Sequence, residues 1–180
     1  MTESADVRVR RTRQRLLAAF AELLLARPYE EITVQLVAAR AGVGRSSLYE
    51  HFRGKRGLLA ASLCGPLAVL ADTVGAADNT AALTSLLRHF WEHRARARGL
   101  FTGAMRPHAV AVLVRLIEER LRRERATLRL PRRLAAIQLA EALFAPLAAW
   151  LTSACACGVP QLACGLRRAA LALRAALRSA

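Results

Sequence analysis

The chain has 180 residues, of which 54% are hydrophobic, and its 28 Lys and Arg against 13 Asp and Glu give a net charge of +15 at pH 7. A chain of this length can bury a proper core, and so basic a balance points to a polyanionic partner. The acidic residues are scattered and no acid, base and nucleophile set converges, so we do not expect an enzyme. No secretory signal and no apolar run of about 18 residues is visible, which leads us to expect a cytoplasmic protein without membrane contact.

The first predicted helix covers residues 10–26 and is followed by Pro28, which cannot continue it. Its core face consists of apolar side chains at helical spacing: Leu16, Phe20, Leu23 and Leu24. A basic arm stands at its start, with four arginines that could reach a DNA minor groove or phosphates: Arg8, Arg10, Arg11 and Arg13. For the first ten residues a solvated, disordered tail is an equally good interpretation.

Two short helices joined by a tight turn are predicted next. Thr33 can cap the first of them, because its hydroxyl can accept from a free backbone amide of the first turn. The apolar face of this helix is formed by Val34, Val37 and Ala38. Gly42 can take a positive φ where the helix ends. The second helix, residues 44–52, turns Leu48 and Phe52 inward, which predicts a helix-turn-helix.

The outward face of the second short helix is unusual for a surface helix. It carries Arg45, Ser46, Ser47, Tyr49, Glu50 and His51. An ordinary surface helix would carry Glu and Lys there, and Ser-Ser-x-Tyr is a poor choice for helix formation. Short donors and an aromatic hydroxyl suit contacts with bases and phosphates. This face predicts a helix that enters the major groove of DNA.

The run TVxxVAxxAGV, residues 33–43, stands in register with LYxHFxxK, residues 48–55. The combined pattern resembles the DNA-binding domain of TetR-family transcriptional regulators. The resemblance implies an all-α fold of about nine helices. It divides the chain into a three-helix helix-turn-helix DNA-binding domain, residues 1–54, and a helical ligand-binding and dimerisation domain, residues 55–180. Gly44 departs from the family pattern, in which Ser or Thr is commoner, and this puts one side-chain cap in doubt.

The resemblance also implies which residues contact DNA. Bases would be contacted by Arg45, Ser47, Tyr49, Glu50 and, from the preceding helix, Gln35. Phosphates would be anchored by Thr33, Tyr49, His51 and Lys55, and Ser46 completes the DNA-binding set. The chemistry agrees, because arginine pairs with guanine and serine tolerates several bases. The alternatives are a solvated charge at Arg45, packing at Tyr49, and a helix-closing role for His51.

The charge does not locate this site. The first 60 residues hold 11 basic and 6 acidic side chains, a balance of +5, while the remaining 120 hold 17 and 7, a balance of +10. Charge therefore supports nucleic acid as the partner, and the motif supplies the position.

The remaining chain is predicted to be helical, with no strand pattern and no repeat. The expected helices are 55–74, with a kink or break at Gly65-Pro66, then 80–98, 108–130, 132–155 and 160–178. A loop over residues 75–79 leads to the helix that Asn79 or Thr80 would cap. A short segment bounded by Gly99, Gly103 and Pro107 separates the middle helices.

The last two helices are apolar on more than one side. Their apolar positions are Leu139, Leu143, Leu147, Trp150 and Leu151, followed by Leu162, Leu166, Ala169, Leu173 and Leu177. A helix of this kind must be buried on more than one side. The family resemblance implies a four-helix bundle with a second subunit, hence a homodimer through residues 132–178 on a near-palindromic operator in double-stranded DNA. A monomer core is the alternative.

The resemblance further implies a small-molecule effector pocket among the middle helices. The candidate lining is His89, Trp91, His93, Phe101, Met105 and Phe144, although each aromatic side chain or Met could equally be core. His89 and His93 have the spacing of a metal pair but lack a carboxylate partner, so we predict neither a metal nor a cofactor.

Three cysteines offer an alternative interpretation of the response. Cys155, Cys157 and Cys164 could sense oxidants or a metal, although cysteine is also a common small buried residue. A helical ligand-binding module without DNA contact is a second alternative, but it leaves the polar face of residues 45–51 unexplained. We predict a ligand-responsive transcriptional regulator, a repressor that leaves its operator when an effector binds.

Overall fold

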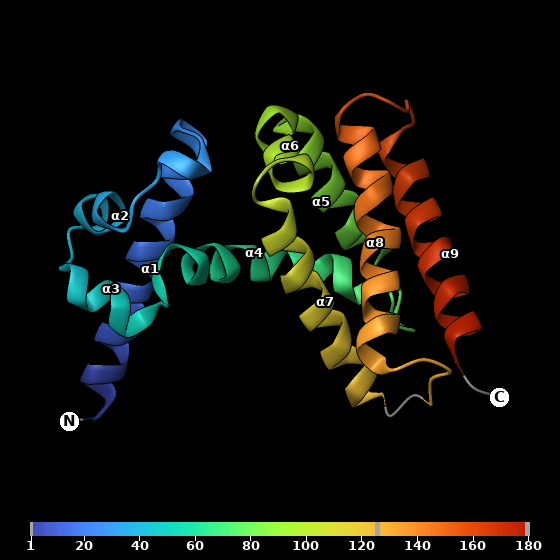
Figure 1. Ribbon diagram of the computed structural model, residues 1–180, viewed down its shortest axis with the longest axis horizontal. Helices are drawn as coiled ribbons and strands as arrows, with labels where there is room; N and C mark the ends of the chain where they lie inside the picture. Colours follow the sequence, from blue (N-terminus) through green and yellow to red (C-terminus); the bar gives the residue numbers. More distant parts are fainter. Residues whose placement is uncertain (1, 125–126, 179–180) are drawn as a thin grey trace. The chain divides into compact units, whose positions relative to one another are not determined.

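The structure is a computed structural model that describes residues 2–124 and 127–178. Over this part of the chain it contains nine α-helices, one short 3-10 helix and no β-strand, so the all-α prediction is confirmed (Figure 1). An isolated bridge pairs Leu128 with Arg178. The chain divides into two compact units, Met1–Leu63 and Cys64–Ala180, and helix α4 contributes to both.

The first unit is a small bundle that contains the helix-turn-helix. Its elements are α1 (Thr2–Ala26), the 3-10 helix η1 (Tyr29–Glu31), α2 (Val34–Ala41), α3 (Arg45–His51) and the start of α4 (Gly54–Asp72). Leu16 and Phe20 of α1, Val37 of α2 and Leu48 of α3 are fully buried together in its core. The predicted core face of α1 is therefore confirmed at Leu16, Phe20 and Leu23, while Leu24 is half-buried.

The turn between α2 and α3 forms as its residues predict. The Thr33 hydroxyl accepts from the Leu36 amide at 3.2 Å, a cap worth about 1 kcal/mol. Gly42 has φ of 62° and ends α2, and the amide of Val43 donates back to the carbonyl of Ala38 at 3.0 Å. Both expectations, the threonine cap and the glycine turn, are confirmed.

The start of α1 differs from the expected basic arm or disordered tail. The helix already begins at Thr2, so Arg8, Arg10, Arg11 and Arg13 lie on helical turns. Side chains 6–11 are exposed, which shows that these turns project beyond the core of the unit.

The second unit is a bundle of helices around α8. After α4 come α5 (Thr80–Glu92), α6 (Arg94–Thr102), α7 (Arg106–Arg123), α8 (Arg132–Leu151) and α9 (Val159–Leu177). Helix α8 packs against α6, α7 and α9. Its five predicted apolar positions are all buried within the single chain: Leu139, Leu143, Leu147, Trp150 and Leu151. By contrast, Ala169 of α9 is exposed, and Leu162 and Leu173 are half-buried.

Several helix boundaries in the second unit differ from the sequence expectation. Helix α4 runs without a break through Gly65 and Pro66, because a single proline removes one backbone donor while flanking leucines hold the helix in the core. The helix expected over 80–98 is two helices, since His93 leaves helical geometry with φ of −110° and ψ of 30°. This break lets α6 bury its own apolar side chains: Ala97, Leu100 and Phe101. Helices α7 and α8 end at Arg123 and Leu151, earlier than expected.

The loop before α5 forms as expected, but a neighbouring residue supplies its cap. Asp78 accepts from the Thr80 amide at 3.0 Å and from the Thr80 hydroxyl at 2.6 Å. These hydrogen bonds lower the pKa of Asp78 below its ordinary value. Asn79 stands at the N-cap position but makes no capping hydrogen bond, and its amide donates instead to the carbonyl of Val69 at 2.9 Å.

A set of arginines ties the end of α4 and the loop after it to α7 and α9. We call this set the arginine clasp; it consists of Arg120, Arg167 and Arg174. Arg120 of α7 donates to Asp72 at 2.6 Å and to the Ala68 carbonyl at 3.0 Å. Its role is to bind the last turn of α4 to α7.

Helix α9 supplies the other two arginines of the clasp. Arg174 donates to the Val74 carbonyl at 2.8 Å and pairs with Glu124, and its side chain is only 10% exposed. Arg167 donates to the Asn79 side chain at 3.1 Å. Two helices, α7 and α9, are thus joined to the segment 72–79 by charged side chains.

Among the described residues, one helix is long and apolar enough to cross a membrane by length and composition. This is α8, with a mean hydropathy of 1.6 over its most apolar window, half of which is buried. Helices α6 and α7 pass the same test only as a pair bent by 78°. The central helix of a packed bundle has these properties without any membrane, because it is surrounded by other helices.

Candidate nucleic-acid interface

Helix α3 presents a packed face and a free face. Leu48 is fully buried and Phe52, which follows the helix, is 5% exposed. On the opposite side Tyr49 is 54% exposed although it is an aromatic residue. The other exposed positions of the helix are Arg45, Ser46 and Glu50, while Ser47 and His51 are half-buried. The polar face identified in the sequence is therefore mostly exposed to solvent.

The predicted contacts outside α3 have different environments. Thr33 and Gln35 are exposed at the start of α2, and the Thr33 hydroxyl is already used by its capping hydrogen bond. Lys55 is half-buried: its ammonium group donates to the Tyr29 carbonyl at 2.9 Å and lies 4.2 Å from the centre of the Tyr29 ring. Burial in turn raises the pKa of Tyr29. Lys55 thus binds η1 to α4, and its contact with a phosphate stays a prediction.

Two residues of α1 support the helix-turn-helix and were missed in the sequence. Arg15 donates to the Ala41 carbonyl at 2.6 Å and to the Gly42 carbonyl at 3.1 Å, so it binds free carbonyls at the end of α2. Arg13 places its guanidinium 4.7 Å from the centre of the Phe52 ring. Their partners lie 26 or more residues away in the sequence, where no local pattern could reveal them.

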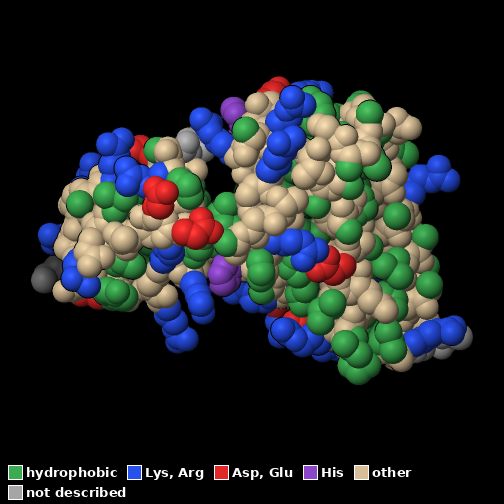
Figure 2. Space-filling model, turned by 45° about the horizontal axis from the view of Figure 1, so that its top comes forward, with side chains coloured by type: hydrophobic (Ala, Val, Ile, Leu, Met, Phe, Trp, Pro, Cys, Tyr) green, Lys and Arg blue, Asp and Glu red, His purple; other side chains and the backbone are tan. Residues whose placement is uncertain are grey.

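The basic charge is not confined to this surface. Figure 2 shows Lys and Arg side chains over both units. Within the first unit, four side chains of α1 surround one shallow hollow of about 300 Å³: Arg8, Arg11, Thr12 and Arg15.

Comparison with known proteins identifies the helix-turn-helix unit. The family model of bacterial regulatory proteins of the tetR family matches residues 16–62. The uncharacterized HTH-type transcriptional regulator TtgW of Pseudomonas putida is 35% identical over 63 residues, which make up 35% of this chain and 47% of TtgW. The match therefore spans about half the length of that relative.

Solved structures extend the likeness to the second unit. A TetR transcriptional regulator from Streptococcus agalactiae is 25% identical with a TM-score of 0.59, over 93% of this chain and 98% of that one. The chain thus contains a helix-turn-helix domain of the TetR family, and its overall fold is that of a solved TetR transcriptional regulator. Thermus thermophilus FadR, a TetR-family repressor solved with lauroyl-CoA, shares the fold at 22% identity and a TM-score of 0.51, over 88% of this chain and 93% of FadR. The architecture is thus a helix-turn-helix domain followed by a second helical domain, as in these regulators.

The structure does not gather the six residues predicted to line an effector pocket. Phe101 and Phe144 are fully buried, and their ring centres are 4.7 Å apart. A side chain with no accessible surface has none to offer a ligand in this conformation. Met105 is half-buried, and its methyl group lies 3.2 Å from the position a Cβ would take at Gly99.

The other three candidates lie on the surface. Trp91 is 38% exposed and stacks on Trp150 with ring centres 4.7 Å apart. His89 and His93 are exposed, with ring centres 4.6 Å apart. Among the described residues, no group of three or more His, Cys, Asp or Glu could hold a metal ion. The four cysteines are free thiols, with Cys155 and Cys164 exposed and Cys64 and Cys157 half-buried.

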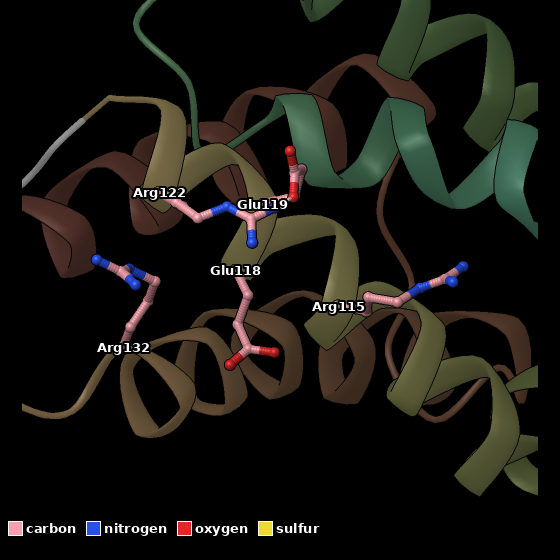
Figure 3. A pocket seen from close by; sticks show the side chains of 5 residues that line it. All are labelled: Arg115, Glu118, Glu119, Arg122 and Arg132. Carbon is pink, nitrogen blue, oxygen red and sulfur yellow. Dashed lines mark ion pairs between the residues drawn. The ribbon is translucent and has the colours of Figure 1, made fainter.

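A hollow of about 360 Å³ lies beside α7 and the start of α8, but it is not suited to an apolar effector. Its lining is charged throughout: Arg115, Glu118, Glu119, Arg122 and Arg132. Figure 3 shows Arg122 directed at Glu119, while Arg115 and Arg132 point to opposite sides. Glu118 pairs with Arg133 at 3.2 Å. The carboxylates of this hollow are therefore used by ion pairs of the bundle itself.

Proposed function

We propose that this TetR-family regulator is a homodimeric repressor that binds a near-palindromic operator through α3 and leaves it when a small effector binds. The observation that carries the proposal is the free face of α3. Tyr49 of α3 is 54% exposed, and the nearby side chains of Arg45 and Ser46 are also exposed to solvent. Phe52, the aromatic residue that follows the helix, is buried. The stability of a monomeric fold does not require these exposed side chains, whereas the major groove of DNA can bind them.

The roles of the residues follow from their chemistry. In this proposal residues 1–54 bind DNA, and residues 55–180 bind the effector and the second subunit. Bases are read by Arg45, Ser47, Tyr49 and Gln35, while Glu50 tunes selectivity because a carboxylate is repelled by phosphates. The phosphate backbone of the DNA is contacted by Thr33, Ser46, His51 and Lys55.

The proposed dimer uses α8 and α9. On α8, Leu134 is 50% exposed and Ile137 is 37% exposed, which is unusual for large apolar side chains of a helix. On α9 the exposed positions include small residues spaced three and four apart: Gly165, Ala169, Ala172 and Ala176. Small side chains allow the helices of a second copy to approach closely, and a twofold dimer then presents two recognition helices to successive half-sites.

The proposed effector acts through α4. This helix joins the first unit to the bundle, so a ligand that favours one arrangement of the bundle helices shifts the separation of the two recognition helices. The complex of FadR with lauroyl-CoA supports an effector of small-molecule type. A cytoplasmic location follows from the proposed action on DNA.

The test begins with selection of duplexes from a random library by repeated binding to the wild-type protein. We expect a consensus of two inverted half-sites, bound with an affinity that falls steeply with salt. Tyr49→Ala should weaken binding to the selected duplex by about 1–3 kcal/mol, the range of a good base or phosphate contact.

Trp91→Ala is the matched control, because it removes an exposed aromatic ring from the second unit and should leave DNA affinity unchanged. Failure to recover any consensus would overturn the proposed function. Full retention of affinity in Tyr49→Ala would overturn the assignment of the site. Light scattering of the free protein tests the dimer, and a reporter gene placed behind the selected duplex separates repression from activation.

A further inference from the structure

The N-terminal turns of α1 carry a concentration of positive charge that the fold does not use. Between residues 6 and 11 the sequence has three arginines, Arg8, Arg10 and Arg11, and a single carboxylate, Asp6. Val7 and Val9 are 54% and 50% exposed, so these turns bury little within the chain. The charge is therefore free to meet a partner.

The contacts further along α1 show which way this charge faces. Arg15 binds the carbonyls of the turn that precedes α3, and Arg13 lies over Phe52, which follows α3. At residues 13–15, α1 therefore runs beside both ends of the recognition helix. Arg8 and Arg11 share a face with Arg15, because they precede it by seven and four residues. Figure 1 shows the N-terminal turns of α1 continuing beyond α3.

We infer that the face formed by Arg8 and Arg11 binds the phosphate backbone of DNA just outside the half-site that α3 reads. This inference rests on the proposed function and extends the contact surface beyond the helix-turn-helix. The helical conformation decides between the two targets open to a basic segment. An α-helix with side chains is about 10–12 Å across, whereas the minor groove of B-DNA is about 6 Å wide, so these turns cannot enter it as an extended arm would. They can lie along the phosphates.

The experiment compares two variants that lose the same charge. Arg8→Gln/Arg11→Gln removes two charges from α1, and Arg88→Gln/Arg96→Gln removes two from exposed positions of the second unit. Glutamine keeps helix propensity close to that of arginine, and circular dichroism checks the helix content of both proteins. Affinity is measured at several salt concentrations for the selected duplex and for a scrambled duplex of the same length.

We expect the α1 variant to bind more weakly, by about tenfold or more near 0.1 M salt, on both duplexes. The slope of log K against log salt should become shallower by about 1.8 for each bound subunit, since each lost phosphate contact removes about 0.9. The control variant should keep the slope of the wild type. On a selected duplex trimmed to the two half-sites, the difference between the α1 variant and the wild type should disappear.

Each contrary outcome is distinct. An unchanged slope and affinity in the α1 variant, while Tyr49→Ala is impaired, overturns this inference and leaves the proposed function standing. Weakening on the selected duplex alone shows that these arginines read bases and overturns the phosphate assignment. Equal losses in both double variants show that only net charge matters, which also overturns it. Absence of any selected consensus is a failure of the proposed function itself.

Discussion

Arginine has different tasks in the two units of this protein. On the free face of α3 and the first turns of α1, Arg45, Arg8 and Arg11 are exposed side chains. In the second unit, Arg120 and Arg174 of the arginine clasp lie largely inside the fold, with side chains 20% and 10% exposed. These three arginines of the first unit are therefore available to a partner, whereas the clasp arginines of the second unit connect helices.

This difference explains why net charge is a poor guide to the DNA-binding surface. Residues 61–180 hold more of the excess charge than the first 60 do. Some of the arginines there already bind carboxylates or carbonyls of the fold, as Arg106 does by pairing with Glu141 at 2.5 Å. A guanidinium that already donates to the fold has less to offer a phosphate. Exposure and free donors, rather than charge counts, mark the surface that can bind DNA.

The largest expected effect comes from removing a clasp arginine. Arg174→Ala should lower the free energy of unfolding by about 2–4 kcal/mol, because it leaves Glu124 and the Val74 carbonyl without their donor. The Nε atom of Arg174 finds no acceptor among the described residues, and its loss therefore costs nothing. Arg168→Ala, an exposed position on the same helix, should change stability by less than about 0.5 kcal/mol. Urea unfolding of both variants measures the difference. Equal unfolding midpoints would show that the clasp arginine stabilises the fold no more than an exposed arginine does.

The second prediction concerns an arginine of the first unit, whose removal should affect DNA binding rather than stability. Arg45→Ala should weaken operator binding by about 1–3 kcal/mol, since arginine is the usual partner of guanine. Stability should stay the same or rise slightly, because Arg45 is the first residue of α3, where the helix dipole disfavours a positive charge. Fluorescence anisotropy and thermal unfolding of one preparation give both values. A variant that unfolds early but binds normally would assign Arg45 to the fold instead.

The smallest expected effect concerns pH and the loop next to the clasp. The pKa of Asp78 is held below its ordinary value by the hydrogen bonds from Thr80. A carboxyl with a depressed folded pKa contributes stability above its ordinary pKa and loses it as the pH falls through the folded value. The melting temperature of the wild type should therefore exceed that of Asp78→Ala at pH 7, and the gap should narrow below about pH 4.

A repeat of this measurement at high salt separates two contributions. Asp78 also lies 3.4 Å from Arg167, and that exposed attraction is screened by salt, whereas the hydrogen bonds to Thr80 persist. A gap that is constant across the acid range would show that Asp78 does not cap α5 through its charge.

The elements that were predicted well depend on neighbours in the sequence. The Thr33 hydroxyl accepts from an amide three residues away. The amide of Gly42, at the end of α2, donates to the carbonyls of Ala38 and Ala39. The core face of α1 follows from a repeat of apolar side chains. Local chemistry of this kind is complete within a few residues, so the sequence displays it directly.

The elements that were predicted poorly depend on packing. The break between α5 and α6 falls at His93, where no glycine or proline indicates it in the sequence. It exists because α6 turns its own apolar side chains into the core. At Gly65 and Pro66, where the sequence predicts a kink or break, α4 continues without a break. The predicted effector residues scatter between core and surface, because a pattern of aromatics cannot tell which rings will stack on one another.

The sequence by itself determined the fold class and the position of the TetR-type helix-turn-helix, since helix caps, turn glycine and apolar spacing act over short distances. Only the tertiary structure decided which arginines stay free. The partner of Arg15 lies 26 residues away in the sequence and the Val74 carbonyl lies 100 residues from Arg174. A long, flexible guanidinium binds whatever carbonyl or carboxylate the fold brings near it, and that depends on the packing of whole helices.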